Sequence, residues 1–192
     1  MSEEHSQVTQ RVNKVEALRA RGIEPYGARF DGKTALEQIT TQYGPLPKPD
    51  LETNQVHKKI AGRVVSIRRF GKAAFAHLRD ASGQLQVYFK KNLLGENGTA
   101  IFEKLDIGDT LGVDGRLFRT KTDELTLEAH KLTFLSKSLH PLPEKWHGLT
   151  DVALRYRMRY LDLIANPEVK KVFEVRSKII NTIRLFLTER GF

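Results

Sequence analysis

The sequence contains no cysteine, and this absence excludes several classes of site at once. Disulfide bonds, zinc ribbons, iron–sulfur clusters and thiol nucleophiles all depend on cysteine. No apolar run approaches the roughly 20 residues that a membrane helix needs, and residues 1–5 lack the pattern of a secretory signal. We therefore expect a cytoplasmic protein without a membrane partner.

The usual signatures of nucleotide and metal chemistry are also missing. The phosphate-binding loops GxxxxGK[ST] and GxGxxG do not occur, and the six histidines show no metal-ligand spacing such as HExxH. Asp106 and Asp109 flank a turn, so we interpret them as turn formers rather than as an acid–base pair. The sequence thus predicts neither a catalytic residue nor a metal site in this chain.

Positive charge, by contrast, is plentiful. The 192 residues include 32 Lys and Arg against 23 Asp and Glu, which gives a formal net charge of +9. Such an excess favours nucleic acid as a partner, because each phosphate contact releases counterions. A merely solvated basic surface explains the charge alone equally well.

Residues 1–56 are expected to form a helix followed by an extended spacer. Over 6–21 the apolar residues recur at three- and four-residue steps, which predicts one helix that ends near Gly22. Its basic residues fit either RNA contacts or simple exposure to solvent. Three prolines within 44–49 disfavour helix and central strand, so we expect an extended segment there.

Within a domain expected over 57–137, residues 59–136 change to a period of two, which is typical of half-buried strands. We expect five strands, with a short helix at 99–105 between the third and the fourth. The expected strands are 60–69, 72–79, 84–89, 110–119 and 124–135. This order predicts a five-stranded OB-fold barrel, so the fold class is mainly β with flanking helices (α+β).

The outward face of the second and third strands carries the candidate binding residues. Phe75 and His77 alternate away from the core on one strand, as Gln86 and Tyr88 do on the next. An exposed aromatic ring can stack on an unpaired base, and a glutamine amide can both donate to and accept from a base edge. The alternative interpretation is that Phe75 packs under the first helix and that Gln86 merely faces solvent.

Two charged residues extend this face. Arg68, near the end of the first strand, offers a donor to a phosphate or a base, and Glu124 offers an acceptor to a base amino or imino group. We therefore predict that Arg68, Phe75, Gln86 and Glu124 bind RNA, with His77 and Tyr88 as further contacts.

The remainder of the chain reads as a linker over 138–150 and helices over 151–163 and 167–190. The last helix has a broad apolar stripe with nothing after it to cover it, so we expect self-association. The stripe residues expected at a dimer interface are Val172, Phe173, Ile179, Ile180, Ile183 and Phe186.

Long segments of the chain resemble the bacterial lysyl-tRNA synthetases, which are class II aminoacyl-tRNA synthetases. The segments that carry the resemblance are residues 21–26 (RGIEPY), 71–75 (GKAAF), 105–109 (LDIGD), 141–148 (PLPEKWHG), 155–163 (RYRMRYLDL), 176–180 (RSKII) and 189–192 (ERGF). The resemblance implies an OB-fold anticodon-binding domain, then the start of a class II catalytic domain at 151–192 that ends within motif 1. It also implies that the motif 1 helix forms a homodimer interface.

The resemblance further implies particular roles for the candidate residues. Phe75 looks like the aromatic that stacks on the central anticodon uridine, and Gln86 like the amide that reads its edge. Arg68 and Glu124 resemble residues that contact the flanking anticodon bases. The full enzyme would use ATP and Mg²⁺ to activate lysine and would transfer it to tRNA(Lys). Motifs 2 and 3 are absent from this chain, so we expect it to bind none of these cofactors and to be inactive alone.

Two alternatives stay open. One is a free-standing OB module that binds single-stranded nucleic acid without regard to sequence. The other is part of an aspartyl- or asparaginyl-tRNA synthetase of the same subgroup. The paralogue of lysyl-tRNA synthetase that modifies an elongation factor is disfavoured, because that family lacks an amino-terminal barrel.

Overall fold

A computed structural model describes residues 3–27, 29–143 and 149–192 of the chain. It divides the chain into two compact units, Met1–Pro141 and Leu142–Phe192, which are treated separately below. Within the described residues, no helix combines the length and the apolar character that crossing a lipid bilayer requires.

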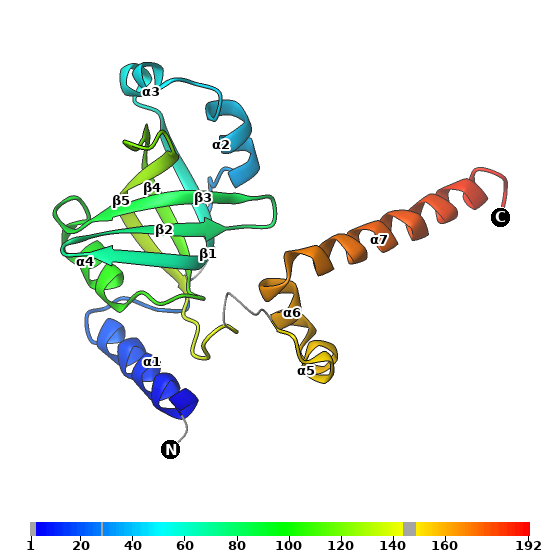
Figure 1. Ribbon diagram of the computed structural model, residues 1–192, viewed down its shortest axis with the longest axis horizontal. Helices are drawn as coiled ribbons and strands as arrows, with labels where there is room; N and C mark the ends of the chain where they lie inside the picture. Colours follow the sequence, from blue (N-terminus) through cyan, green and yellow to red (C-terminus); the bar gives the residue numbers. More distant parts are fainter. Residues whose placement is uncertain (1–2, 28, 144–148) are drawn as a thin grey trace. The chain divides into compact units, whose positions relative to one another are not determined.

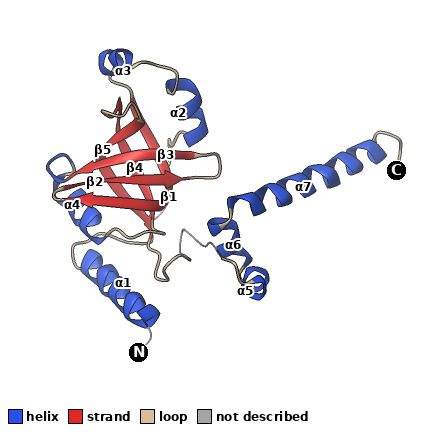
Figure 2. Ribbon diagram, viewed as in Figure 1, coloured by secondary structure: helices blue, strands red, loops and turns tan. Residues whose placement is uncertain are grey.

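The first unit is built on a closed five-stranded barrel with the strand order β1-β2-β3-β5-β4 (Figure 2). All strand pairs are antiparallel except β3–β5, which is parallel. The strands are β1 (His57–Phe70), β2 (Ala73–Arg79), β3 (Gln84–Lys90), β4 (Thr110–Arg119) and β5 (Leu125–Ser136). These bounds confirm the predicted strands to within three residues at each end, and the closed barrel confirms the OB-fold prediction.

The barrel interior follows the alternation of the sequence. Buried side chains alternate with more exposed ones along both strands. The buried ones are Ala74, Ala76 and Leu78 of β2 and Val87 and Phe89 of β3. Ala73, at the start of β2, is also buried. Because every second side chain points inward, the outer face of the same strands is left for other contacts.

Helices pack around the barrel, and α1 (Glu3–Arg19) lies against α4 (Gly95–Lys104) (Figure 1). The helix α1 buries Val15 and Leu18, as its apolar stripe predicts. Its basic residues are partly structural: Lys14 Nζ lies 2.5 Å from Asp106 Oδ1, and Arg11 donates to the backbone carbonyl of Ser138. A 3₁₀ turn η1 (Lys91–Leu93) and α4 lie between β3 and β4, so the predicted inter-strand helix is confirmed and begins earlier than expected.

The expected extended spacer before the barrel is wrong in part. Two short helices occupy it, α2 (Leu36–Tyr43) and α3 (Lys48–Asn54), and they bury Leu36, Ile39 and Leu51. The prolines do not prevent α3, because Pro47 stands at its N-cap and another proline lies in its first turn, where no backbone N–H is needed.

The described residues of the second unit form three helices, α5 (Val152–Arg157), α6 (Arg159–Ala165) and α7 (Pro167–Thr188). The single helix expected over 151–163 is therefore wrong, since Met158 leaves helical geometry. Neither glycine nor proline marks this break. Asp162 is buried and accepts hydrogen bonds from Arg155 in α5 and from Arg159 and Asn166, so one carboxylate joins the two short helices to the start of α7.

The last helix has no buried residue, and its apolar side chains are open to solvent. Val172, Ile179 and Ile183 are each more than half exposed, at 67%, 54% and 54%. The uncovered stripe predicted from the sequence is therefore present. Part of the expected linker, residues 144–148, lies outside the described residues.

Candidate nucleic-acid interface

The predicted aromatic and basic residues lie in one row across the outer face of the barrel. Phe75 of β2 pairs with Arg68 of β1 on one side and with Tyr88 of β3 on the other. Tyr88 in turn pairs with Glu128 of β5. The backbone register thus places Arg68, Phe75 and Tyr88 side by side, although Arg68 and Tyr88 are 20 positions apart in the sequence.

The rings form a longer aromatic series than the sequence indicated. The Phe75 ring centroid lies 5.5 Å from that of Phe70 and 4.9 Å from that of Tyr88, and the Tyr88 centroid lies 6.1 Å from that of Phe118. Phe70 is 46% exposed. Phe118 was missed although its outward position in β4 follows from strand alternation, because only the barrel topology brings β4 next to this face.

A second row runs beside the aromatic one; it carries polar residues on β1, β2, β3 and β5 and ends at Phe118 on β4. Successive Cα partners join Ser66, His77, Gln86, Thr126 and Phe118, in the order β1-β2-β3-β5-β4. Phe75 and Gln86 are diagonal neighbours on β2 and β3, a distance that aromatic and long side chains span. An aromatic surface and an amide therefore stand side by side.

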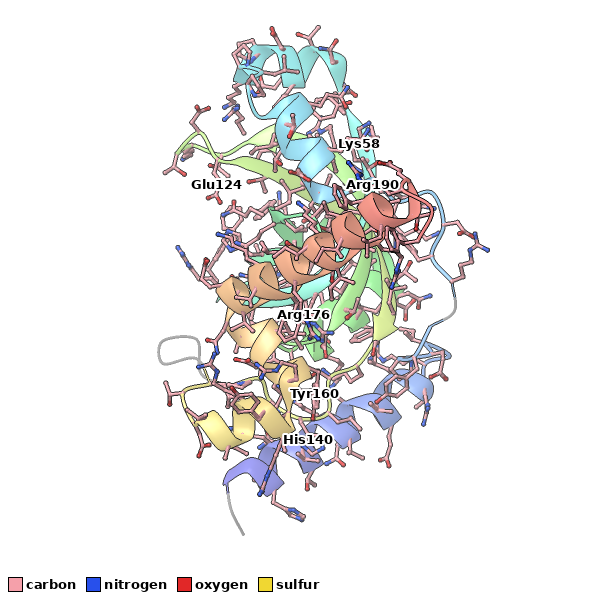
Figure 3. All side chains as sticks on the ribbon, turned by 90° about the vertical axis from the view of Figure 1, so that its right-hand side faces the viewer. Lys58, Glu124, His140, Tyr160, Arg176 and Arg190 are labelled. Atoms are coloured by element: carbon pink, nitrogen blue, oxygen red, sulfur yellow. The ribbon has the colours of Figure 1, made fainter. Side chains whose placement is uncertain are left out.

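Glu124 joins this row from the turn between β4 and β5, where Figure 3 labels it. Its carboxylate accepts a hydrogen bond from Gln86 Nε2 at 2.7 Å and lies 3.3 Å from His77 Nε2. The structure thus places Glu124 against Gln86 and His77, two other residues predicted to bind RNA. Its carboxylate remains about half exposed, at 47%, and keeps lone pairs for a ligand.

The two arginines at the end of β1 differ in their roles. Arg69 donates to the carbonyls of Phe102 and Leu105, and its guanidinium stacks 4.9 Å from the Phe102 ring, so it fixes α4 to the barrel. Arg68 is exposed beside Phe75, and the described residues provide no hydrogen bond to its side chain. The guanidinium of Arg68 is therefore open to a ligand, whereas that of Arg69 is already engaged.

The chemistry of this face suits an unpaired base. It presents aromatic rings for stacking, an amide with both donor and acceptor groups, and a free guanidinium for phosphate.

Asp106 and Asp109 do not form an acid–base site. Lys137 Nζ lies 2.6 Å from Asp106 Oδ2 and 2.7 Å from Asp109 Oδ2, so both carboxylates belong to a structural ion cluster.

The alternative in which Phe75 packs under the first helix finds no support in the described contacts. The rings next to Phe75 belong to Phe70 and Tyr88, both on the barrel, whereas α1 lies against α4 and the loop that precedes β4. Phe75 remains partly exposed on the outer face.

Two protein families match separate parts of the chain. Residues 58–135 match a family of OB-fold nucleic acid binding domains that is named for the tRNA anticodon, and residues 151–192 match the class II tRNA synthetases of the D, K and N group. The first match covers the barrel from β1 to β5, and the second covers α5 to α7. The chain therefore carries an OB-fold domain and the first part of a class II synthetase domain.

Similarity to individual proteins extends over nearly the whole chain. The lysine--tRNA ligase of Carboxydothermus hydrogenoformans is 48% identical over 95% of this chain, and that of Pelotomaculum thermopropionicum is 50% identical over 95%. The lysine--tRNA ligase of Streptococcus pneumoniae (strain Hungary19A-6) is 47% identical over 100% of the chain. The aligned part makes up 36%, 35% and 39% of these relatives, so the chain spans little more than a third of their length.

Proposed function

Because this chain corresponds to the anticodon-binding OB domain and the first part of the class II domain of a lysine--tRNA ligase, we propose that the outer barrel face binds the anticodon loop of tRNA(Lys). The observation that carries the proposal is the joint position of Phe75, Gln86 and Arg68 on this face. A loop with unstacked bases is the kind of RNA that such a face can recognise.

Each residue of the face has a role that its geometry supports. Phe75 stacks on the central anticodon base, which contributes about 1–3 kcal/mol for a base on an aromatic ring. Gln86 forms hydrogen bonds to the edge of that base. Arg68 and Glu124 contact the flanking nucleotides, and the exposed Phe70 and the partly exposed Tyr88 and His77 line the path of the RNA.

The parent enzyme would activate lysine with ATP and Mg²⁺ and transfer it to tRNA(Lys) in the cytoplasm. Within the described residues, no three His, Asp or Glu side chains are grouped so that they could hold a metal ion. The buried carboxylate of Asp162 is bonded to Arg155 and Arg159. We assign the chain a part in tRNA binding.

The exposed apolar side of α7 supports a second role, as a homodimer interface. The helix presents Val172, Phe173, Ile179, Ile180, Ile183 and Phe186, all of them exposed. Contiguous apolar surface of this kind is characteristic of protein–protein contacts. A second copy of the same helix would cover it.

The test of the anticodon proposal compares two RNA stem-loops that differ only in the anticodon, UUU and GUC, across a series of salt concentrations. We expect the chain to bind the UUU loop more tightly at every salt concentration, because salt weakens phosphate contacts equally for both loops. Equal affinities that respond only to salt would instead support a sequence-blind single-strand binder. Tighter binding of the GUC loop would support the aspartyl alternative.

A further inference from the structure

Five polar side chains on the barrel face form one continuous series of hydrogen bonds. Ser66 Oγ lies 2.9 Å from His77 Nδ1, and His77 Nε2 lies 3.3 Å from Glu124 Oε1. Gln86 Nε2 lies 2.7 Å from Glu124 Oε2, and Thr126 Oγ1 lies 2.8 Å from Gln86 Oε1. The series thus runs from β1 through β2 and β3 to β5.

The Glu124 carboxylate fixes the direction of the two hydrogen bonds that it receives. A carboxylate accepts and cannot donate, so His77 Nε2 and Gln86 Nε2 must both carry the hydrogens that point at Glu124. The second ring nitrogen of His77 lies against the Ser66 hydroxyl, which can donate or accept. The Gln86 carbonyl faces the opposite way and accepts from the hydroxyl of Thr126.

This arrangement fixes the orientation of the Gln86 amide. A rotation by 180° would place the carbonyl oxygen against the Glu124 carboxylate and the amino group against the Thr126 hydroxyl. The rotated amide would lose its bond to the carboxylate and replace it with repulsion between two acceptors. The Glu124 carboxylate, which His77 restrains, therefore sets the orientation of the amide. The Thr126 hydroxyl adds a hydrogen bond to Gln86 Oε1 in this orientation, and it also lies 3.1 Å from the backbone carbonyl oxygen of Glu124.

A fixed amide matters because uracil and cytosine present opposite hydrogen-bonding edges. Uracil donates from N3 and accepts at O4, whereas cytosine accepts at N3 and donates from its amino group. Beyond its bonds within the series, Gln86 retains one hydrogen on Nε2 and one lone pair on Oε1. At a base that stacking on Phe75 holds in one position, a freely rotating amide would match either pyrimidine, whereas an amide held in one orientation matches only one of them.

We propose that Thr126 and Glu124 act as an amide lock, by which we mean that they hold Gln86 in the orientation that accepts uracil and rejects cytosine at the base stacked on Phe75. His77 acts one step further away by holding Glu124. These are positioning roles, since buried Thr126 cannot itself touch the RNA. The inference rests on the proposed anticodon function and adds how the central base is selected.

The test uses the full 192-residue chain and two stem-loops that differ in the central anticodon base, UUU and UCU. The variant is Thr126→Val, which keeps the shape of the side chain and removes the hydroxyl; Thr126→Ser keeps the hydroxyl and serves as the matched control. We expect Thr126→Val to lower the ratio of UUU to UCU affinity by about 3- to 10-fold, the usual worth of one hydrogen bond, while Thr126→Ser preserves it.

Glu124→Gln provides a second route if Thr126→Val does not fold. The amide that Glu124→Gln introduces can itself rotate to suit either orientation of Gln86. We therefore expect the same loss of discrimination between the UUU and UCU loops. An unchanged UUU to UCU ratio in a folded Thr126→Val or Glu124→Gln chain would overturn the amide lock, as would an equal loss of affinity for both loops. If the unaltered chain shows no preference and Phe75→Ala changes nothing, the anticodon function itself fails.

Discussion

Lys137 places its ammonium nitrogen 2.7 Å from Asp109 Oδ2, and neither side chain is exposed to solvent. The same ammonium lies 2.6 Å from Asp106 Oδ2, and Asp106 also meets Lys14 of α1. The cluster therefore joins the end of β5, the loop before β4 and the first helix. The ion pairs of the cluster involve none of the residues predicted to bind RNA, so its effects on stability can be separated from effects on binding.

We predict that Lys137→Met destabilises the chain by about 3–5 kcal/mol, because removing one partner leaves buried charge without compensation. Burial raises the pKa of Asp109, and the charge of Lys137 opposes that effect. Without Lys137 the pKa rises further and the folded state takes up a proton more readily, so the loss should be smaller at acidic pH than at neutral pH.

Urea denaturation at two pH values measures the Lys137→Met effect. Lys121→Met, in the exposed β4–β5 turn, is the matched control and should change stability by less than about 0.5 kcal/mol. Equal free energies of unfolding for Lys137→Met and Lys121→Met would show that the ion cluster contributes nothing to the stability of the chain.

Asp80 should make the fold sensitive to acid. Its carboxylate accepts hydrogen bonds from Ser82 N, Ser82 Oγ and Gly83 N in the β2–β3 turn and from Leu36 N at the start of α2. Burial alone would raise the pKa of Asp80, but these hydrogen bonds lower it below its usual value. The stabilisation is therefore complete above the unfolded pKa of about 3.9 and is lost as the pH falls through the lower, folded value.

Asp80→Asn should consequently flatten the dependence of unfolding free energy on pH below about pH 4. Ser82→Ala, which removes one of the donors, should flatten it to a smaller extent. Chemical denaturation at a series of pH values gives both slopes. Parallel curves for the parent and Asp80→Asn would refute this role of the carboxylate.

The apolar side of α7 predicts association that depends on concentration. Ile183 is 54% exposed, and Ile183→Asp introduces a charge into the centre of the proposed homodimer interface. We expect sedimentation velocity to show a shift from larger species to monomer for Ile183→Asp and no such shift for Thr182→Asp, on an adjacent side of the helix. A parent chain that stays monomeric over a wide concentration range would contradict the proposed interface.

The barrel could be predicted from the sequence because each strand is specified locally. The alternation of Ala74, Ala76 and Leu78 with Phe75 and His77 defines two faces before any pairing is known. The helix α3 was missed because three nearby prolines suggested an extended segment, yet prolines at the first turn of a helix cost little.

The candidate site could be predicted only in part. Phe75, Gln86 and Tyr88 share a hairpin, so strand alternation alone groups them. Thr126 and Phe118 join them through the parallel β3–β5 pair and barrel closure, which are properties of the tertiary fold. The direct bond between Glu124 and Gln86, 38 residues apart, has no local signal for the same reason.

The central claim is that the barrel face reads the anticodon through Phe75, and its most direct test is the affinity of the UUU stem-loop for the parent and for Phe75→Ala. Ile107→Ala, which removes an exposed side chain beside the ion cluster, is the matched control. We predict that Phe75→Ala weakens binding of the UUU loop by about 1–3 kcal/mol, while Ile107→Ala leaves it unchanged. Equal affinities of Phe75→Ala and the parent at both low and high salt would contradict the claim.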